Sequence, residues 1–292
     1  MSRPRNWTFL GDSLTEGVGS SRASYVTELA RLLRQADAQA QPQAIHDIRL
    51  RDVDPATFNP YLRTNLAGYL DLDPQAADDA VWMWNLASEG RTIETDVRWL
   101  PLLRNLQPER IFIYRGSLES MLRPAAVRDG QWPAWVPASW RGFVAMDPRC
   151  YFSSTWWRRA KQVTIDRLKQ VARLRLLRER PPLPLFDAEV ILAEYTALLK
   201  ALRPFGARVW VLGLVRPDPA CFPGTPEHFL RLNESLGRLA RAEGAEFIDW
   251  GRGIEASGLR AWRYRDGFHP NLAGARLMAE ILRTRLAAEL AW

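Results

Sequence analysis

The stretch Trp7-Thr8-Phe9-Leu10-Gly11-Asp12-Ser13-Leu14 decides the fold and carries the first chemical signal of the chain. Its first four residues are apolar or β-prone and predict a short buried strand that stops at Gly11. Ser13 then lies on a strand-to-loop turn before a predicted helix, whose first N–H groups would favour developing negative charge. A serine in this place is also typical of a plain helix N-cap. The stretch therefore predicts a nucleophile or a cap at the end of a buried strand.

A second segment near the other end of the chain, residues 266–271, offers partners for that serine. A serine hydroxyl attacks only when a base removes its proton, and the base needs a third group that fixes its tautomer. Asp266 and His269 are three residues apart on a predicted loop, a spacing that lets carboxylate and imidazole meet through one turn. The alternative interpretation is a helix start, with Asn271 as its cap. With Ser13, the two residues make a candidate Ser-His-Asp set.

The chain holds only two other histidines, His46 and His228. His46 lies in a doubtful edge strand, and His228 opens a predicted helix. We interpret both as surface or packing residues, so His269 is the predicted base.

Strands and helices alternate along the whole chain, which indicates a parallel sheet covered by helices on both faces. Beyond the first strand, buried strands are predicted at residues 80–84, 110–114, 207–213 and 246–250, with an edge strand within 45–53. Helices are predicted at residues 25–33, 92–103, 195–202, 229–242 and 272–286, and a loop at 37–44. Ligands of such sheets bind beyond the carboxyl ends of the strands. The loops that carry Ser13, Gly90 and Gly116 each follow a strand, so they are expected at one edge.

Residues 122–187 do not fit the alternation, because a crossover needs only a dozen or more residues. The segment carries five tryptophans and a basic run at residues 158–180 with interleaved apolar residues. We interpret it as an insertion, a lid or subdomain, within a single catalytic domain of residues 1–292. The tryptophans fit a small core or a surface for sugar rings or acyl chains. The basic run fits a solvated helix face, or docking to an acidic carrier protein or an anionic membrane surface.

The overall composition is that of an ordinary globular protein, with 47% hydrophobic and 25% charged residues. The formal charge of +7 comes from arginine, since the chain has three lysines, which favours codon bias over selection for charge. A nucleic-acid partner is not expected, because no nucleic-acid motif accompanies the charge. Two cysteines make no disulfide framework, and no signal peptide or long apolar stretch is seen. A cytoplasmic location is expected.

The two end segments together resemble the first and last sequence blocks of the SGNH (GDSL) hydrolases. The likeness rests on Gly11-Asp12-Ser13-Leu14 with Gly17, and on Asp266-x-x-His269-Pro270. Residues 85–90 resemble the second block, and residues 233–249 resemble the late helix and strand of the family. The resemblance covers the chain outside the insertion. It implies a three-layer α/β/α fold of the flavodoxin-like type, acyl-ester chemistry, no metal or other cofactor, and an oxyanion contact from the Gly90 N–H.

The third block is where the chain departs from the family, which has Gly-x-Asn-Asp after the third predicted strand. Here the sequence reads Gly116-Ser117-Leu118-Glu119, so a leucine replaces the asparagine whose amide binds the oxyanion. Loss of one such donor typically costs about 10²–10³ in rate. Three outcomes are open: a weakened enzyme, an oxyanion hole of backbone N–H groups alone, or a substitute donor. The candidate substitutes are Ser117, Ser120, Arg115 and Arg123. Glu119, at the position of the aspartate, is interpreted as structural, with a bond to backbone near the Ser13 turn.

These observations predict a serine esterase that acts through an acyl-enzyme. Ser13 is the expected nucleophile, His269 the base and Asp266 the orienting acid. O-acyl esters of a carbohydrate or small metabolite, O-acetyl esters first, are the expected substrates. The alternatives are an O-acyltransferase with the same residues and a catalytically weakened binding protein of the same fold. The oligomeric state does not follow from the sequence.

Overall fold

A computed structural model of the chain describes residues 5–17, 24–36, 45–49, 81–87, 92–141, 156–259, 261–264 and 266–287. Its centre is a sheet of six parallel strands in the order β2-β3-β1-β4-β5-β6. The strands are β1 Arg5–Gly11, β2 Ile45–Arg49, β3 Val81–Asn85, β4 Arg110–Tyr114, β5 Arg208–Leu212 and β6 Glu246–Ile248. All five predicted strands and the edge strand are present, which confirms the parallel α/β class.

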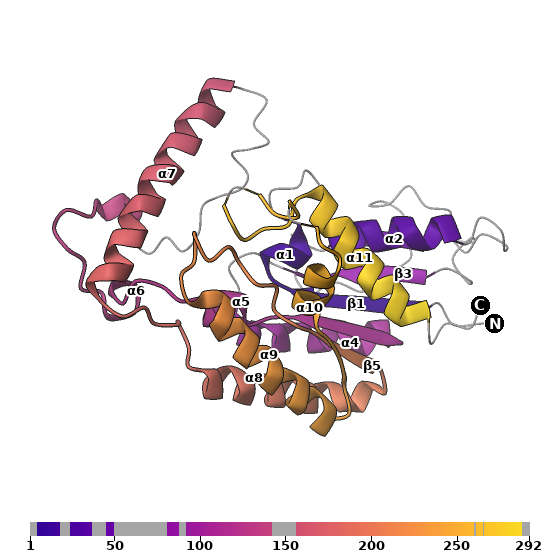
Figure 1. Cartoon of the computed structure of the whole chain (residues 1–292). Coiled ribbons are helices and arrows are strands. Elements are labelled where there is room, and N and C mark those ends of the chain that lie inside the picture. The colour runs from indigo at the N-terminus through magenta and orange to yellow at the C-terminus, as the bar shows by residue number, and fades with distance from the viewer. Residues whose placement is uncertain are drawn as a thin grey trace.

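Helices cover both faces of the sheet and complete the three layers (Figure 1). The helices of the described residues are α1 Ser13–Glu16, α2 Tyr25–Ala36, α4 Leu100–Leu106, α5 Ser117–Ser120, α6 Ala126–Asp129, α7 Trp156–Glu179, α8 Ala188–Leu202, α9 Thr225–Ala242, α10 Trp250–Ala256 and α11 Leu272–Ala287, with 3₁₀ turns at Ile93–Trp99 (η3), Ala138–Trp140 (η4) and Arg203–Phe205 (η6). One face carries α2, α10 and α11, and the other carries α8 and α9 with the 3₁₀ helix η3. The predicted loop at 37–44 lies outside the described residues.

Aromatic side chains tie the central strands to the first helix layer. Phe9 of β1 stacks on Phe112 of β4 with ring centroids 4.6 Å apart. Phe9 also meets the edge of Tyr25, which in turn packs on Trp250 at 4.6 Å. All four rings are fully buried. Because β1 lies at the centre of this cluster, the turn that follows it starts from a rigid base.

Two predicted elements differ from the structure. The predicted helix at 92–103 is a 3₁₀ helix that gives way to α4, with Pro101 in the first turn of α4. A proline lacks the N–H that a continuous α-helix would need there. The predicted strand at 246–250 ends at Ile248, because the Asp249 side chain accepts the Arg252 N–H at 3.0 Å and thereby caps α10.

The predicted insertion leaves and rejoins the body at one place. Arg123 and Leu183 exchange two backbone hydrogen bonds, each 2.9 Å long. Beyond this bridge, α7 stands away from the body with its N-terminal end outermost, as Figure 1 shows, and Trp156 at that end is 79% exposed. The other end of α7 is docked, since Arg173 and Leu176 are buried. Among the described helices, each is too short or too polar to span a bilayer.

Candidate active site

The sheet order places a topological switch point beside β1. The chain moves from β1 to the edge strand β2 and back to β3, and then crosses to β4 on the other side of β1. Connections that follow β1 and β4 therefore diverge, and such a point is where ligands of open α/β sheets bind. Two of the three loops predicted to carry chemistry, those at Ser13 and at Gly116, begin here.

The turn after β1 presents Ser13 at the start of α1. Gly11 is required, because a Cβ at this position would lie 2.1 Å from Thr15 Oγ1. Asp12, not Ser13, caps the helix: its Oδ1 accepts the Leu14 N–H at 2.9 Å. Gly17 ends α1 with a positive φ of 81°. The cap interpretation of the sequence thus belongs to Asp12, and it leaves the Ser13 hydroxyl to another partner.

Strand β3, which neighbours β1, also stabilises the Ser13 turn. Asn85, the last residue of β3, donates its amide to the Thr15 carbonyl at 2.8 Å. The Thr15 hydroxyl lies 3.0 Å from the Tyr25 hydroxyl in the buried aromatic cluster. Each bond is buried, where it is stronger than in water, so the Ser13 turn is fixed on two sides.

The structure brings Ser13, His269 and Asp266 together from opposite ends of the chain. Ser13 Oγ lies 2.9 Å from His269 Nε2, and His269 Nδ1 lies 2.7 Å from Asp266 Oδ2. A carboxylate can only accept, so Nδ1 carries the proton and Nε2 is the acceptor for the serine hydroxyl. Asp266 is 1% exposed, and its other oxygen accepts the backbone N–H groups of Phe268 and His269 at 3.0 and 3.1 Å.

Packing also fixes the loop that carries His269. The Phe268 ring lies 5.0 Å from the imidazole and 6.0 Å from the Phe222 ring, measured between centroids. Gly267 has a φ of 74° and lies so close to Cys221 that a Cβ would come within 2.8 Å of it. Its carbonyl accepts the Asp218 N–H at 2.7 Å. The His269 loop is therefore packed against the loop at 218–222, which follows β5.

The candidate oxyanion groups have other partners in the described structure. The Ser117 hydroxyl donates to Asp12 Oδ2 and the Ser120 hydroxyl to the Gly116 carbonyl. Arg115 is fully buried and donates to both oxygens of Asp96, at 2.8 and 2.5 Å. Arg123, also buried, donates to the Leu118 carbonyl. Gly90 lies outside the described residues. The part of the site that would bind the oxyanion is thus not assembled from the predicted side chains.

Two buried carboxyl groups lie beside the serine turn. Burial raises the pKa of Asp12 above its ordinary value, against the hydrogen bonds from Ser117 and from the Leu14 N–H. Burial also raises the pKa of Glu119 to about 7, against the hydrogen bond that its Oε1 accepts from the Ile93 N–H at 2.8 Å. Glu119 is structural, as predicted, but its contact is with the 3₁₀ helix and not with the Ser13 turn.

Asp12, Asn85 and Phe268 were not predicted as site residues, although each one supports a residue that was. A weak signal existed for the first two, because Asp12 adjoins Ser13 and Asn85 ends a predicted strand at the same edge. Phe268 carried no signal, since an apolar residue beside a histidine is common in any core.

His228 is the one other histidine whose side chain the structure describes. His228 is half-buried in α9, and burial lowers its pKa. In the described part of the chain, no three histidine, cysteine or acidic side chains are grouped so that they could hold a metal ion.

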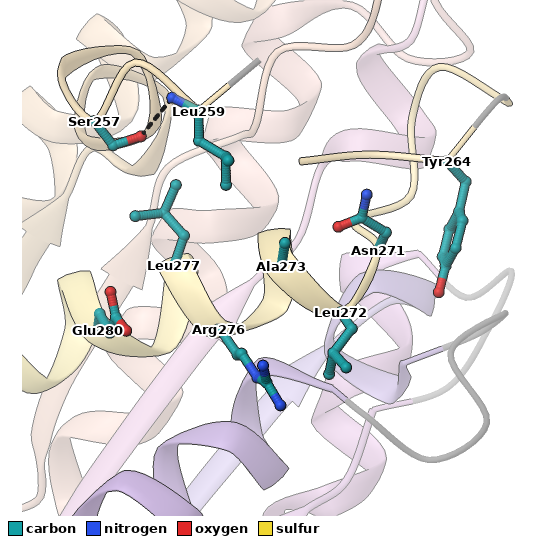
Figure 2. A pocket seen from close by; sticks show the side chains of 9 residues that line it. All are labelled: Ser257, Leu259, Tyr264, Asn271, Leu272, Ala273, Arg276, Leu277 and Glu280. Carbon is teal, nitrogen blue, oxygen red and sulfur yellow. Dashed lines mark hydrogen bonds between the residues drawn. The ribbon is translucent and has the colours of Figure 1, made fainter. Parts of the chain in front are cut away.

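A hollow of ≈ 690 Å³ lies along α11, and its lining includes neither Ser13 nor His269 (Figure 2). Leu272, Arg276 and Leu277 of α11 form one wall, and Tyr264 and Asn271 lie at one end of it. The Tyr264 N–H donates to the His269 carbonyl at 2.9 Å, so the hollow adjoins the back of the His269 loop. It is separate from the candidate active site.

The protein has a three-layer α/β/α fold, and serine, histidine and aspartate side chains are bonded in series at the carboxyl edge of its sheet. This arrangement is typical of serine hydrolases. The chain belongs to the GDSL-like lipase/acylhydrolase family, whose model matches residues 9–277. This family is the one that the end segments resemble.

Solved structures share the fold at low sequence identity. A protein described as a GDSL-like lipase, from Parabacteroides merdae, is 14% identical with a TM-score of 0.53, over 97% of this chain and 96% of its own. A catalytic mutant of an acetylxylan esterase from Geobacillus stearothermophilus is 10% identical, with a TM-score of 0.51 over 98% and 95%. A further acetyl xylan esterase is 12% identical, with a TM-score of 0.51 over 96% and 99%. No curated protein sequence matches the chain.

Proposed function

We propose that the protein is a serine esterase in which Ser13 is the nucleophile, His269 the general base and acid, and Asp266 the orienting carboxylate. The observation that carries the proposal is the bonded series from Ser13 Oγ to His269 at 2.9 Å and on to Asp266 at 2.7 Å. Both distances suit proton transfer and orientation in the resting enzyme. Membership of the GDSL-like lipase/acylhydrolase family supports the same chemistry.

In the first half of the reaction, Ser13 Oγ attacks the ester carbonyl carbon while His269 Nε2 takes the hydroxyl proton. The tetrahedral intermediate collapses when the same proton passes to the departing alkoxide, which leaves as the alcohol. The product is an acyl-enzyme on Ser13. Asp266 stabilises the imidazolium that forms in each step and holds its Nδ1 proton away from the substrate.

In the second half, water replaces the alcohol. His269 Nε2 removes a proton from the water as its oxygen attacks the acyl carbon, and then returns this proton to Ser13 Oγ as the acid leaves. An alcohol in place of water would give acyl transfer by the same steps. We propose backbone N–H groups of Ser13 and Gly90 as the oxyanion donors, because the side chains of Ser117, Arg115 and Arg123 are bonded elsewhere.

O-acetyl esters of carbohydrates are the substrate class that we propose first. Two of the solved structures of the same fold are acetylxylan esterases. The exposed Trp156 of the insertion offers an aromatic face of the kind that suits sugar rings. We retain the insertion, residues 122–187, as a proposed lid or subdomain of one catalytic domain.

A catalytically weakened protein of this fold is the second candidate, and Leu118 is the observation that favours it. The side chain of leucine cannot donate a hydrogen bond, and the family's donor at this position is therefore lost. The two candidates differ in one measurable property, which is turnover that depends on the Ser13 hydroxyl.

The test measures hydrolysis of 4-nitrophenyl acetate by the wild type, by Ser13→Ala and by Ser235→Ala, a control at a partly exposed position of α9. Turnover in the wild type and in Ser235→Ala, with none in Ser13→Ala, is the expected result. A serine-directed fluorophosphonate, with the labelled residue located by mass spectrometry, covers the case of a poor ester. Equal turnover in Ser13→Ala and the wild type would exclude Ser13 as the nucleophile, whereas no turnover and no labelling of Ser13 would favour the weakened protein.

A further inference from the structure

One buried arginine of the insertion helix contacts the 218–222 loop, which packs against the His269 loop. Arg173 is on the docked end of α7 and is 3% exposed. Its Nη1 donates to the Cys221 carbonyl at 3.1 Å and its Nη2 to the Leu122 carbonyl at 3.0 Å. The guanidinium therefore joins two segments, the start of the insertion after α5 and the 218–222 loop after β5.

A second residue of α7 holds the same loop. Gln170 lies one turn before Arg173 and donates its amide to the Cys221 thiol at 3.0 Å. Burial raises the pKa of this thiol, so it remains protonated. The guanidinium of Arg173 also lies over the Phe222 ring, 4.1 Å from its centroid. Three contacts from one face of α7 thus fix two consecutive residues, Cys221 and Phe222.

Cys221 and Phe222 are the residues of the 218–222 loop against which the His269 loop packs. Cys221 fills the space beside Gly267, where no Cβ would fit. Phe222 packs on Phe268, which packs edge-on against the imidazole of His269. An unbroken series of contacts runs from Arg173 to the base, and every ring and polar group in it is buried or nearly so.

Burying the Arg173 guanidinium costs free energy, and its hydrogen bonds to neutral groups do not offset this cost. Burial, together with the charge of Arg123, lowers the pKa of Arg173 to about 10. Its hydrogen-bond partners are neutral carbonyl groups, so a leucine or methionine of similar volume would pack without that cost. What the guanidinium supplies, and an apolar side chain cannot, is a planar fork that joins two carbonyl groups in a fixed geometry.

We propose that Arg173 is a positioning residue for His269: by clamping the 218–222 loop, it makes the docking of the insertion helix a condition for the correct orientation of the base. This inference rests on the proposed function, in which His269 acts on Ser13. It assigns the insertion a part in the reaction that does not depend on contact with the substrate.

The test compares Arg173→Met, Arg173→Lys and Arg167→Met, an equivalent change at an exposed position of the same helix. With 4-nitrophenyl acetate, well below the melting temperature and per mole of folded enzyme, Arg173→Met should lower kcat by about tenfold or more, as a small misplacement of a catalytic group does. Its KM should change by less than about threefold, because the substrate contacts are unchanged. Arg173→Lys should recover part of the loss, and Arg167→Met should match the wild type.

A spectroscopic measurement separates positioning from stability and from the proposed function. The Nδ1 proton that His269 donates to Asp266 should give a far-downfield proton resonance, assigned by its loss in His269→Asn. This resonance should shift or broaden in Arg173→Met and stay in place in Arg167→Met, even if Ser13→Ala proves as active as the wild type. If Arg173→Met fails to fold, Arg173→Lys answers the same two questions. An unchanged kcat together with an unchanged resonance overturns the proposal, however far the melting temperature falls.

Discussion

Two short helices follow the neighbouring strands β1 and β4, and they use their polar residues in opposite ways. Each spans four residues; α1 starts two residues after Gly11, the last residue of β1, and α5 starts directly after Gly116, two residues beyond β4. In α1 the Ser13 hydroxyl meets the imidazole of His269. In α5 the Ser117 hydroxyl bonds Asp12, and that of Ser120 bonds the Gly116 carbonyl.

The difference teaches that two helices of equal length at one sheet edge need not have equal chemistry. The polar groups around α5 are bonded within the protein, from Arg115 on Asp96 to Glu119 on the Ile93 N–H. Of the α5 bonds, the one from Ser117 braces the serine turn, because it holds the carboxylate that caps α1. We infer that α1 carries the reacting hydroxyl of Ser13 and that α5 holds the turn of α1 in place.

The largest expected effect comes from removing the Ser13 hydroxyl, and removal of the Ser117 hydroxyl is the comparison. Ser13→Ala removes the nucleophile and should lower kcat by about 10⁴-fold or more. Ser117→Ala removes one bond to Asp12 and should cost about tenfold, as a slightly misplaced nucleophile does. Steady-state kinetics with 4-nitrophenyl acetate distinguish them. A loss of about 10²–10³ in Ser117→Ala would show instead that this hydroxyl binds the oxyanion.

The supporting role of the α5 side predicts a second effect, on stability. Asp96→Asn removes the carboxylate charge that pairs with the fully buried Arg115, and it should lower the free energy of unfolding by about 3–5 kcal/mol. Glu246→Gln breaks the exposed pair with Arg208 and should cost no more than about 1 kcal/mol. Urea unfolding measures both. A small effect of Asp96→Asn would contradict the assignment of Arg115 to the support.

Glu119 predicts a smaller effect that depends on pH. Its folded pKa of about 7 is above the ordinary value of 4.5 because the carboxyl group is buried. Between these two values the folded protein holds a proton that the unfolded chain has released, so stability falls as pH rises through this window. The fall amounts to at most about 3 kcal/mol.

Glu119→Gln, which keeps an acceptor for the Ile93 N–H, should remove this part of the pH dependence. Denaturant unfolding at pH 5 and pH 8 should show the variant close to the wild type at pH 5 and more stable than the wild type at pH 8. Glu94→Gln, at an exposed residue, is the matched control. Parallel curves for Glu119→Gln and the wild type would show that Glu119 is ionised in the folded protein throughout this range.

The sequence was sufficient to predict the residues that come together at Ser13, for a physical reason. Parallel strands separated by helices must end at one edge, so short polar motifs directly after strands are expected to meet there. Ser13 could be assigned to this edge from its own strand. Asp266 and His269 follow no strand directly, and their pairing was predicted from spacing and from resemblance to the family.

The supporting contacts could not be predicted, because each depends on a distance between segments that have no common pattern. Arg115 is as probable a surface residue as any in a chain with so many arginines, and its partner Asp96 lies in a segment with an ordinary helical pattern. Arg173 belongs to a basic run that we interpreted as a solvated face or a docking surface. Its burial depends on how α7 packs on the 218–222 loop, which periodicity within α7 does not indicate.

The smallest predicted effect addresses Leu118, the residue of α5 at which the chain departs from its family. Leu118→Asn returns an amide donor to the position where the family resemblance places one, and it should raise kcat about tenfold, less than the 10²–10³ that such a donor contributes in an established oxyanion hole. The gain should be incomplete because the bonds from Arg123 to the Leu118 carbonyl and from Ser117 to Asp12 fix α5 in its supporting role. Leu118→Ala, which opens space without adding a donor, is the control, and kinetics with 4-nitrophenyl acetate compare the two. Equal rates in both variants would mean that α5 cannot reach the oxyanion, and that backbone N–H groups alone must stabilise it.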